Sequence, residues 1–72
     1  MDAMSDARER LLRDDPAFRR LSEKHHQFEL RLDSLRSKRF LSEEEKTEEV
    51  RLKKLKLAAK DEMEQILRRT RD

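Results

Sequence analysis

The sequence predicts an all-α protein, built as an antiparallel two-helix hairpin that resembles a coiled coil, and three observations support this. Half of the 72 residues are charged and Gly is absent, a composition typical of long helices and coiled coils. Apolar residues recur at helical spacing in two long stretches. A single Pro and one Ser-containing break divide the chain. Because a core in so short a chain contributes only about 3–5 kcal/mol, we also expect self-association into a helical bundle.

The N-terminal segment, residues 1–15, is the least determined part of the chain. Ser5 is a candidate N-cap for a short helix that runs to about Arg13. Leu11 and Leu12 give this segment a small apolar patch. Terminal segments fray unless something ties them down, so the sequence leaves open whether residues 1–15 dock on the main body or fray.

The first long helix is predicted over residues 16–39. Asp15 is a good N-cap, and Pro16 suits the first helical position, where its missing N–H is not needed. The positions that follow step by three and four residues, which is heptad spacing. They are Phe18, Leu21, His25, Phe28, Leu32 and Leu35. Arg39 extends the seam if its methylenes lie along the apolar surface.

A turn is predicted at residues 40–42 and a second helix at residues 43–69. Ser42 and Glu45 have the spacing of a capping box, and Leu41 precedes the cap as in a hydrophobic staple. So short a connection favours antiparallel neighbours, with residue i facing roughly residue 83 minus i. The core positions predicted for the second helix are Leu52, Leu55, Ala59, Met63 and Ile66.

Several large apolar residues fall outside this predicted seam. They are Leu30, Phe40, Val50, Leu57 and Leu67. Scattered surface leucines are normal in soluble proteins, but two helices alone bury little surface, so we interpret these residues as a contact with a second copy of the chain. The sequence does not distinguish a dimer from a tetramer.

Two sequence patterns together resemble a known family. One is Phe18-x-x-Leu21-x-x-x-His25-x-x-Phe28-x-x-x-Leu32, and the other is the lysine-rich run from Leu52 to Met63. This pairing resembles the YdcH-like family of small bacterial proteins, a domain of unknown function, over about residues 14–67. The resemblance implies a self-associating helical hairpin with no known catalytic activity. The residues that match the family pattern are His25, Lys53, Lys54, Lys56, Lys60 and Asp61. Leu55 and Ala59 depart from it.

His25 interrupts the apolar seam of the first helix, with Glu29 one turn further on. The simplest interpretation is a polar layer that fixes register or oligomeric state. Two alternatives stay open. A histidine and a carboxylate at this spacing can contribute to a metal site if a second subunit supplies more ligands, and a histidine in a contact can respond to pH. We predict no metal or cofactor from this pair alone.

The lysines of the second helix have two interpretations. Lys53, Lys56 and Lys60 share one helix face and are candidate phosphate contacts. Acidic residues are interleaved with them, and the chain has 19 basic and 17 acidic residues with only 4% aromatics. This balance favours a salt-bridged, solvated face over a nucleic-acid surface.

Composition also argues against other function classes. There is no Cys and no Gly-rich phosphate loop, and no apolar run near the ~20 residues of a membrane span. We therefore expect a cytoplasmic protein that is not an enzyme, with no small-molecule substrate and no membrane contact. The predicted function is a protein–protein interaction or assembly module that binds itself and an unidentified protein partner. The alternative is weak nucleic-acid or ribosome-associated binding through Lys53, Lys54, Lys56 and Lys60.

Overall fold

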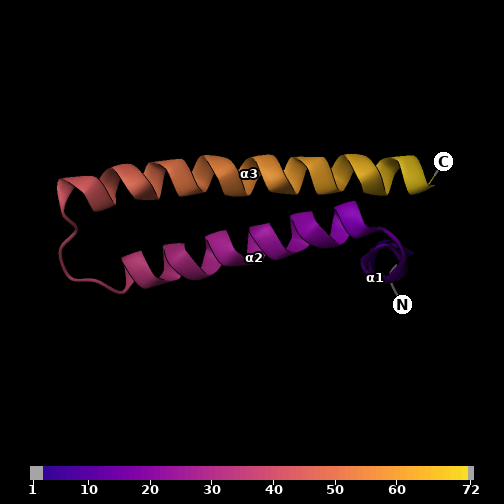
Figure 1. Cartoon of the computed structure of the whole chain (residues 1–72), viewed down its shortest axis with the longest axis horizontal. Helices are drawn as coiled ribbons and strands as arrows, with labels where there is room; N and C mark the ends of the chain where they lie inside the picture. Colours follow the sequence, from indigo (N-terminus) through magenta and orange to yellow (C-terminus); the bar gives the residue numbers. More distant parts are fainter. Residues whose placement is uncertain (1–2, 72) are drawn as a thin grey trace.

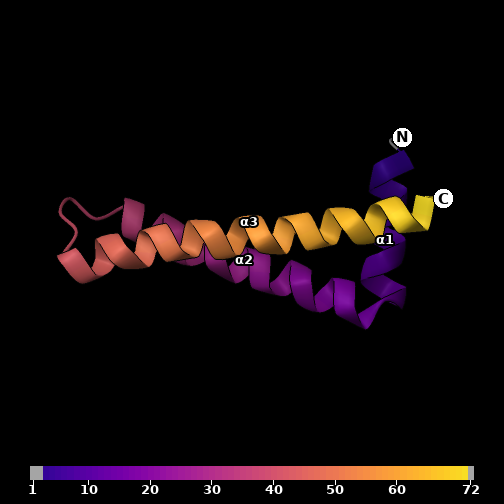
Figure 2. The same cartoon turned by 90° about the horizontal axis from the view of Figure 1, so that it is seen from above.

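The computed structural model describes residues 3–71, with side chains for residues 6–70, and this part of the chain holds three helices and no strand. They are α1 (Ala3–Asp14), α2 (Pro16–Arg36) and α3 (Glu43–Arg71). Helices α2 and α3 run side by side in opposite directions, and α1 crosses them at the end away from the turn (Figures 1 and 2). The all-α prediction is confirmed. The molecule measures 45 × 20 × 19 Å, which is an elongated shape.

Helix α2 begins where the sequence predicts. The Asp15 carboxylate accepts hydrogen bonds from the backbone N–H groups of Ala17 and Phe18, at 2.9 and 3.1 Å, and Pro16 occupies the first turn. These bonds satisfy two of the donors that a helix start leaves free. Asp15 also closes the last turn of α1, because its N–H donates to the Leu11 carbonyl at 2.8 Å.

Helix α2 ends three residues before the predicted boundary at Arg39. Its last helical residue is Arg36, and Ser37 caps it by donating its hydroxyl to the Ser34 carbonyl at 2.7 Å. The connection therefore covers residues 37–42 rather than 40–42. Arg39 lies in this connection and is exposed, so its predicted role as an extension of the seam is wrong.

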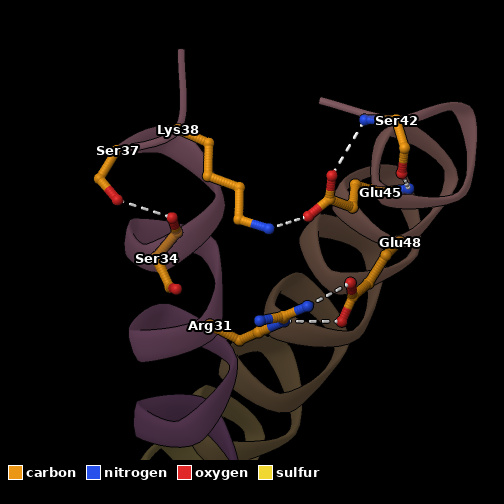
Figure 3. A network of polar contacts seen from close by, with 7 residues as sticks. All are labelled: Arg31, Ser34, Ser37, Lys38, Ser42, Glu45 and Glu48. Carbon is orange, nitrogen blue, oxygen red and sulfur yellow. Dashed lines mark hydrogen bonds and ion pairs between the residues drawn. The ribbon is translucent and has the colours of Figure 1, made fainter. Parts of the chain in front are cut away.

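Helix α3 begins with the predicted capping box. The Ser42 N–H donates to the Glu45 carboxylate at 2.9 Å, and the Glu45 N–H donates to the Ser42 hydroxyl at 3.1 Å (Figure 3). Three glutamates fill the first turn, where negative charge is favourable beside the helix N-terminus. The helix then continues to Arg71, two residues beyond the predicted end.

Helix α1 is docked on the other two helices. The sequence had left open whether residues 1–15 dock or fray. Residues 1–2 lie outside the described range. Helix α1 begins at Ala3, before the cap predicted at Ser5. Leu11 is buried against Phe18, Met63 and Leu67. The Arg19 guanidinium donates to the carbonyls of Leu12 and Arg13 at 3.2 and 3.4 Å, so α2 satisfies acceptors at the end of α1.

The core consists of two apolar clusters. The cluster beside α1 contains Leu11, Phe18, Met63 and Leu67, with Ala7, Leu12, Leu21 and Ile66 partly buried against it. The cluster nearer the turn contains Leu32, Leu35 and Leu52, with Phe28 and Leu41 partly buried against it. Ala59 is also buried. Among the predicted core residues, only Leu55 is exposed, by 42%.

Two residues of α3 exchange the roles that the sequence analysis gave them. Leu67, predicted to lie outside the seam, is 1% exposed, because α1 packs on that side of α3. The buried residues then become Leu52, Ala59, Met63 and Leu67. These four residues define the buried face of α3. At about 100° per residue, Lys56 lies nearer the centre of that face than Leu55 does, so the lysine takes the core-facing position that was predicted for the leucine.

Candidate interaction surface

Five large apolar side chains are exposed on the described surface. They are Leu30, Phe40, Val50, Leu55 and Leu57. Phe40, in the 37–42 connection, is the most exposed of them at 84%. Val50 and Leu57 lie seven residues apart, on the side of α3 that is turned away from its core face. Four of the five were predicted to lie outside the seam, and Leu55 joins them in place of Leu67.

A shallow groove runs along one flank of the α2–α3 pair. Its volume is about 310 Å³, and we call it the basic groove. The residues that line it are Leu32, Arg36, Lys53, Lys56, Leu57 and Lys60. Four of these six residues are cationic and two are leucines. The groove therefore offers positive charge beside apolar surface, a combination that suits an acidic segment with an apolar residue.

The predicted lysine set does not form one continuous stripe. Lys53, Lys56 and Lys60 line the basic groove, but Lys54 lines a separate depression with Thr47, Val50 and Arg51. Asp61 is exposed and lines neither of these hollows. Lys53 approaches Glu49 at 3.6 Å, and Lys56 approaches Glu29 at 3.5 Å. Two of the three lysines in the groove therefore already have acidic neighbours.

His25 lies in a polar hollow of about 270 Å³ where the three helices meet. Its Nε2 atom is 3.7 Å from the Glu29 carboxylate, which also approaches the Lys56 ammonium at 3.5 Å. Arg8 of α1 and Lys60 of α3 line the same hollow. Both His25 and Lys56 are partly buried. They form a polar layer between the two apolar clusters, which fits the register-fixing interpretation of His25.

A network of ion pairs joins α2 and the start of the connection to α3 (Figure 3). The Arg31 guanidinium donates two hydrogen bonds to the Glu48 carboxylate, each 2.9 Å long. The Lys38 ammonium donates to the Glu45 carboxylate. The bond from Lys38, together with that from the Ser42 N–H, lowers the pKa of Glu45 to about 2. The bond from Arg31 likewise lowers the pKa of Glu48.

Sequence reasoning did not identify Arg36 or the Arg31–Glu48 pair. The rule that residue i faces residue 83 minus i places Arg31 opposite Leu52, one turn from Glu48. That rule was therefore accurate to a turn but did not select the partner. Arg36 was missed because only the lysines of the second helix were considered as candidate cationic contacts.

Groups of side chains that could hold a metal ion are a further kind of candidate site. Within residues 3–71, no three His, Cys, Asp or Glu side chains are grouped so that they could hold a metal ion. None of the described helices is long and apolar enough to cross a membrane. Comparison with models of protein families, with curated proteins and with solved structures finds no match.

Proposed function

We propose that this protein is a bacterial, cytoplasmic assembly module that acts by protein–protein interaction and associates with itself. In this proposal the α2–α3 hairpin is the self-associating unit, of the kind found in the YdcH-like family that the sequence resembles. Its function is to present a patterned helical surface and requires no cofactor or small-molecule substrate.

The observation that carries the proposal is the exposed apolar surface. Five large apolar side chains are exposed in a chain where only 33% of residues are hydrophobic. Two of them, Val50 and Leu57, lie seven residues apart on one side of α3, whereas Leu55 lies on another side of the helix. Exposed apolar surface of this kind marks an interaction site when it is rimmed by polar residues. Arg51 and Lys54 lie beside Val50, and Lys53, Lys56 and Lys60 lie beside Leu57.

Sedimentation equilibrium of the full chain tests the proposal. We expect a mass above the 8.8 kDa of one chain, with a concentration-dependent dissociation. Leu57→Ser should shift this equilibrium toward the single chain, whereas Ala58→Ser, at an exposed neighbouring position, should leave it unchanged. A mass of 8.8 kDa at every concentration, with the helical circular dichroism signal intact on dilution, would refute self-association.

Weak nucleic-acid or ribosome-associated binding through the lysines is the alternative function. It has less support, because Lys54 lies apart from the other three and two of those have acidic neighbours. Phosphate contacts strengthen as salt falls. Retardation of a labelled duplex at ~50 mM salt that disappears as salt rises would favour this alternative.

A further inference from the structure

Helix α3 begins with an acidic stretch that is followed by a basic stretch, and the two are complementary in charge. Residues 43–49 contain five Glu and one Lys, whereas residues 51–60 contain five basic residues and no acidic one. The acidic part follows the connection that carries Phe40, and the basic part forms one wall of the basic groove. One chain therefore carries both an acidic segment with an exposed aromatic residue and a groove that is cationic and apolar.

We propose that the basic groove binds the Phe40–Glu44 segment of a second copy of this chain. In this contact Phe40 packs against the exposed Leu57, above Leu32, which is buried at the floor of the groove. Glu43 and Glu44 of the same segment face the cations of the groove. The inference rests on the proposed self-association and names the two surfaces that meet in it.

The groove has unused positive charge. Within the described residues, neither Arg36 nor Lys60 forms an ion pair, and Lys53 has only the long approach of 3.6 Å to Glu49. The apolar part of the groove is provided by Leu57, which is exposed, and by Leu32, which is part of the cluster beneath. An incoming aromatic ring would therefore extend the apolar cluster nearest the turn, and acidic groups beside it would meet free cations.

The Phe40–Glu44 segment has unused acidic and apolar groups. Phe40 is 84% exposed, the Glu43 side chain is 91% exposed, and Glu44 is exposed. Glu43 has one neighbour within its own helix, Lys46, at 3.3 Å. Glu45, by contrast, is held by Ser42 and Lys38. Glu45 therefore stabilises the turn of its own chain, whereas the side chains of Glu43 and Glu44 remain available to a partner.

A single chain cannot make this contact with itself. Glu43 and Leu57 are fourteen residues apart on one helix, which is about 21 Å along the axis at 1.5 Å per residue. In Figure 2 the connection bulges to the same side of α3 as the N-terminal half of α1, whose Arg8 lines the hollow next to the groove. With both surfaces on one side, two copies related by a two-fold axis make the contact twice and form a closed dimer.

Two other occupants fit less well. A nucleic-acid backbone would use the cations but not Leu32 and Leu57, and it would meet the Glu29 carboxylate beside Lys56. A purely apolar helix would leave Arg36 and Lys60 without acidic partners. The segment from a second copy supplies both kinds of group, and it is present at the same concentration as the groove.

Charge reversal followed by mixing tests the proposal. The groove variant carries Lys53→Glu and Lys60→Glu, and the segment variant carries Glu43→Lys and Glu44→Lys. We expect each variant alone to dimerise roughly tenfold or more weakly than the wild type, because like charges then face each other. An equimolar mixture of the two should recover dimerisation, since the reversed groove of one then faces the reversed segment of the other.

Two controls accompany this experiment. Arg20→Glu with Lys24→Glu changes the net charge by the same amount at exposed positions of α2 that line neither the groove nor the hollows beside it, and should leave dimerisation unchanged. Phe40→Ala should weaken dimerisation without lowering the melting temperature at the lowest protein concentration. Circular dichroism of every variant shows whether it remains helical.

Each outcome decides the proposal. Wild-type mass retained by both variants would overturn this contact and leave the proposed self-association standing. Loss of dimerisation without recovery in the mixture would also overturn it. A wild-type chain that is monomeric at all concentrations would refute both proposals. Duplex binding lost in the groove variant, with its mass unchanged, would assign the groove to phosphate instead.

Discussion

Both ends of the α2–α3 pair contain a buried apolar cluster, but only the cluster at the α1 end is covered by a third helix, and the turn end adds ion pairs. At the α1 end, Phe18 and Leu67 are essentially inaccessible to solvent and pack with Leu11 and Met63. At the turn end, the contacts between the helices also include exposed ion pairs, chiefly Arg31–Glu48. Buried apolar side chains contribute several times more free energy than exposed ion pairs.

The two ends are therefore expected to have different roles, one in the stability of the fold and the other in fixing the helix boundaries. The α1 end should determine most of the free energy of unfolding, since it joins three helices through one apolar cluster. The turn end determines where α2 stops and α3 starts, because its hydrogen bonds have strict geometric requirements. The two ends therefore respond differently to substitution, salt and pH.

The largest expected effect is that of Phe18→Ala. Phe18 has 0% exposure at the centre of the α1-end cluster, and truncating a buried Phe costs about 3–5 kcal/mol. A core of this size provides about the same amount, so we expect the variant to lose its cooperative urea transition. Phe40→Ala, the same change at the exposed aromatic, should leave the urea midpoint of the dilute protein unchanged.

A small effect of Phe18→Ala would contradict the main role given to the α1 end. If Phe18→Ala still unfolded cooperatively at nearly the wild-type midpoint, the α1-end cluster would not be the main source of stability. Hydrogen exchange would then identify which helix keeps its amides protected, because the most stable unit exchanges last.

A smaller effect is expected from Leu67→Ala, which should be compared with Leu55→Ala. Removing the buried Leu67 side chain should cost about 2–5 kcal/mol, whereas the exposed Leu55 should cost less than about 1 kcal/mol. The two changes remove the same atoms from the same helix, so the difference in urea midpoint measures burial directly. Equal costs would mean that α1 does not cover Leu67 in solution.

The sequence allowed the starts of α2 and α3 to be predicted because they depend on local groups, whereas α1 begins before the cap predicted at Ser5. Asp15 and Ser42 satisfy N–H groups within three residues, as the cap pattern predicts. Most core positions of α2 also follow from heptad spacing alone. Exposure of Leu30 and Phe40 was predicted for the same reason, since both fall outside that spacing.

The exchange of Leu55 and Leu67 was not predictable from periodicity. Whether α1 docks depends on how Leu11 fits against α2 and α3 together, and spacing within one helix contains no information about that fit. Once α1 covers Leu67, the buried face of α3 rotates and Lys56 replaces Leu55. The early end of α2 was missed because Ser37 bonds back to its own helix, a choice that competes with helix continuation.

The Arg31–Glu48 pair should have a smaller, salt-dependent effect. We expect a double-mutant cycle with Arg31→Gln and Glu48→Gln to give a favourable interaction at low salt, since the pair is bidentate. Screening by added salt should remove most of it, because both groups are exposed. The cost of Leu67→Ala should not change with salt in this way. A salt-independent interaction would mean that the pair is more buried in solution than this structure shows.

The last expected effect is a pH dependence that comes from Glu45. Its pKa is lowered from 4.5 to about 2 by Lys38 and by the Ser42 N–H, so the folded state favours the charged carboxylate more than the unfolded state does. The resulting stabilisation is fully present above pH 4.5 and is lost as the pH falls through about 2.

Gln retains the capping-box geometry, so Glu45→Gln removes the charge alone. Wild type and Glu45→Gln should therefore differ in melting temperature at neutral pH and converge in acid. Glu44→Gln should not reproduce this pattern, because the Glu44 side chain forms no hydrogen bond or ion pair among the described residues. If the wild type and Glu45→Gln melted in parallel across that range, the Lys38–Glu45 bond would not hold the turn in solution, and the helix ends would depend on the backbone caps alone.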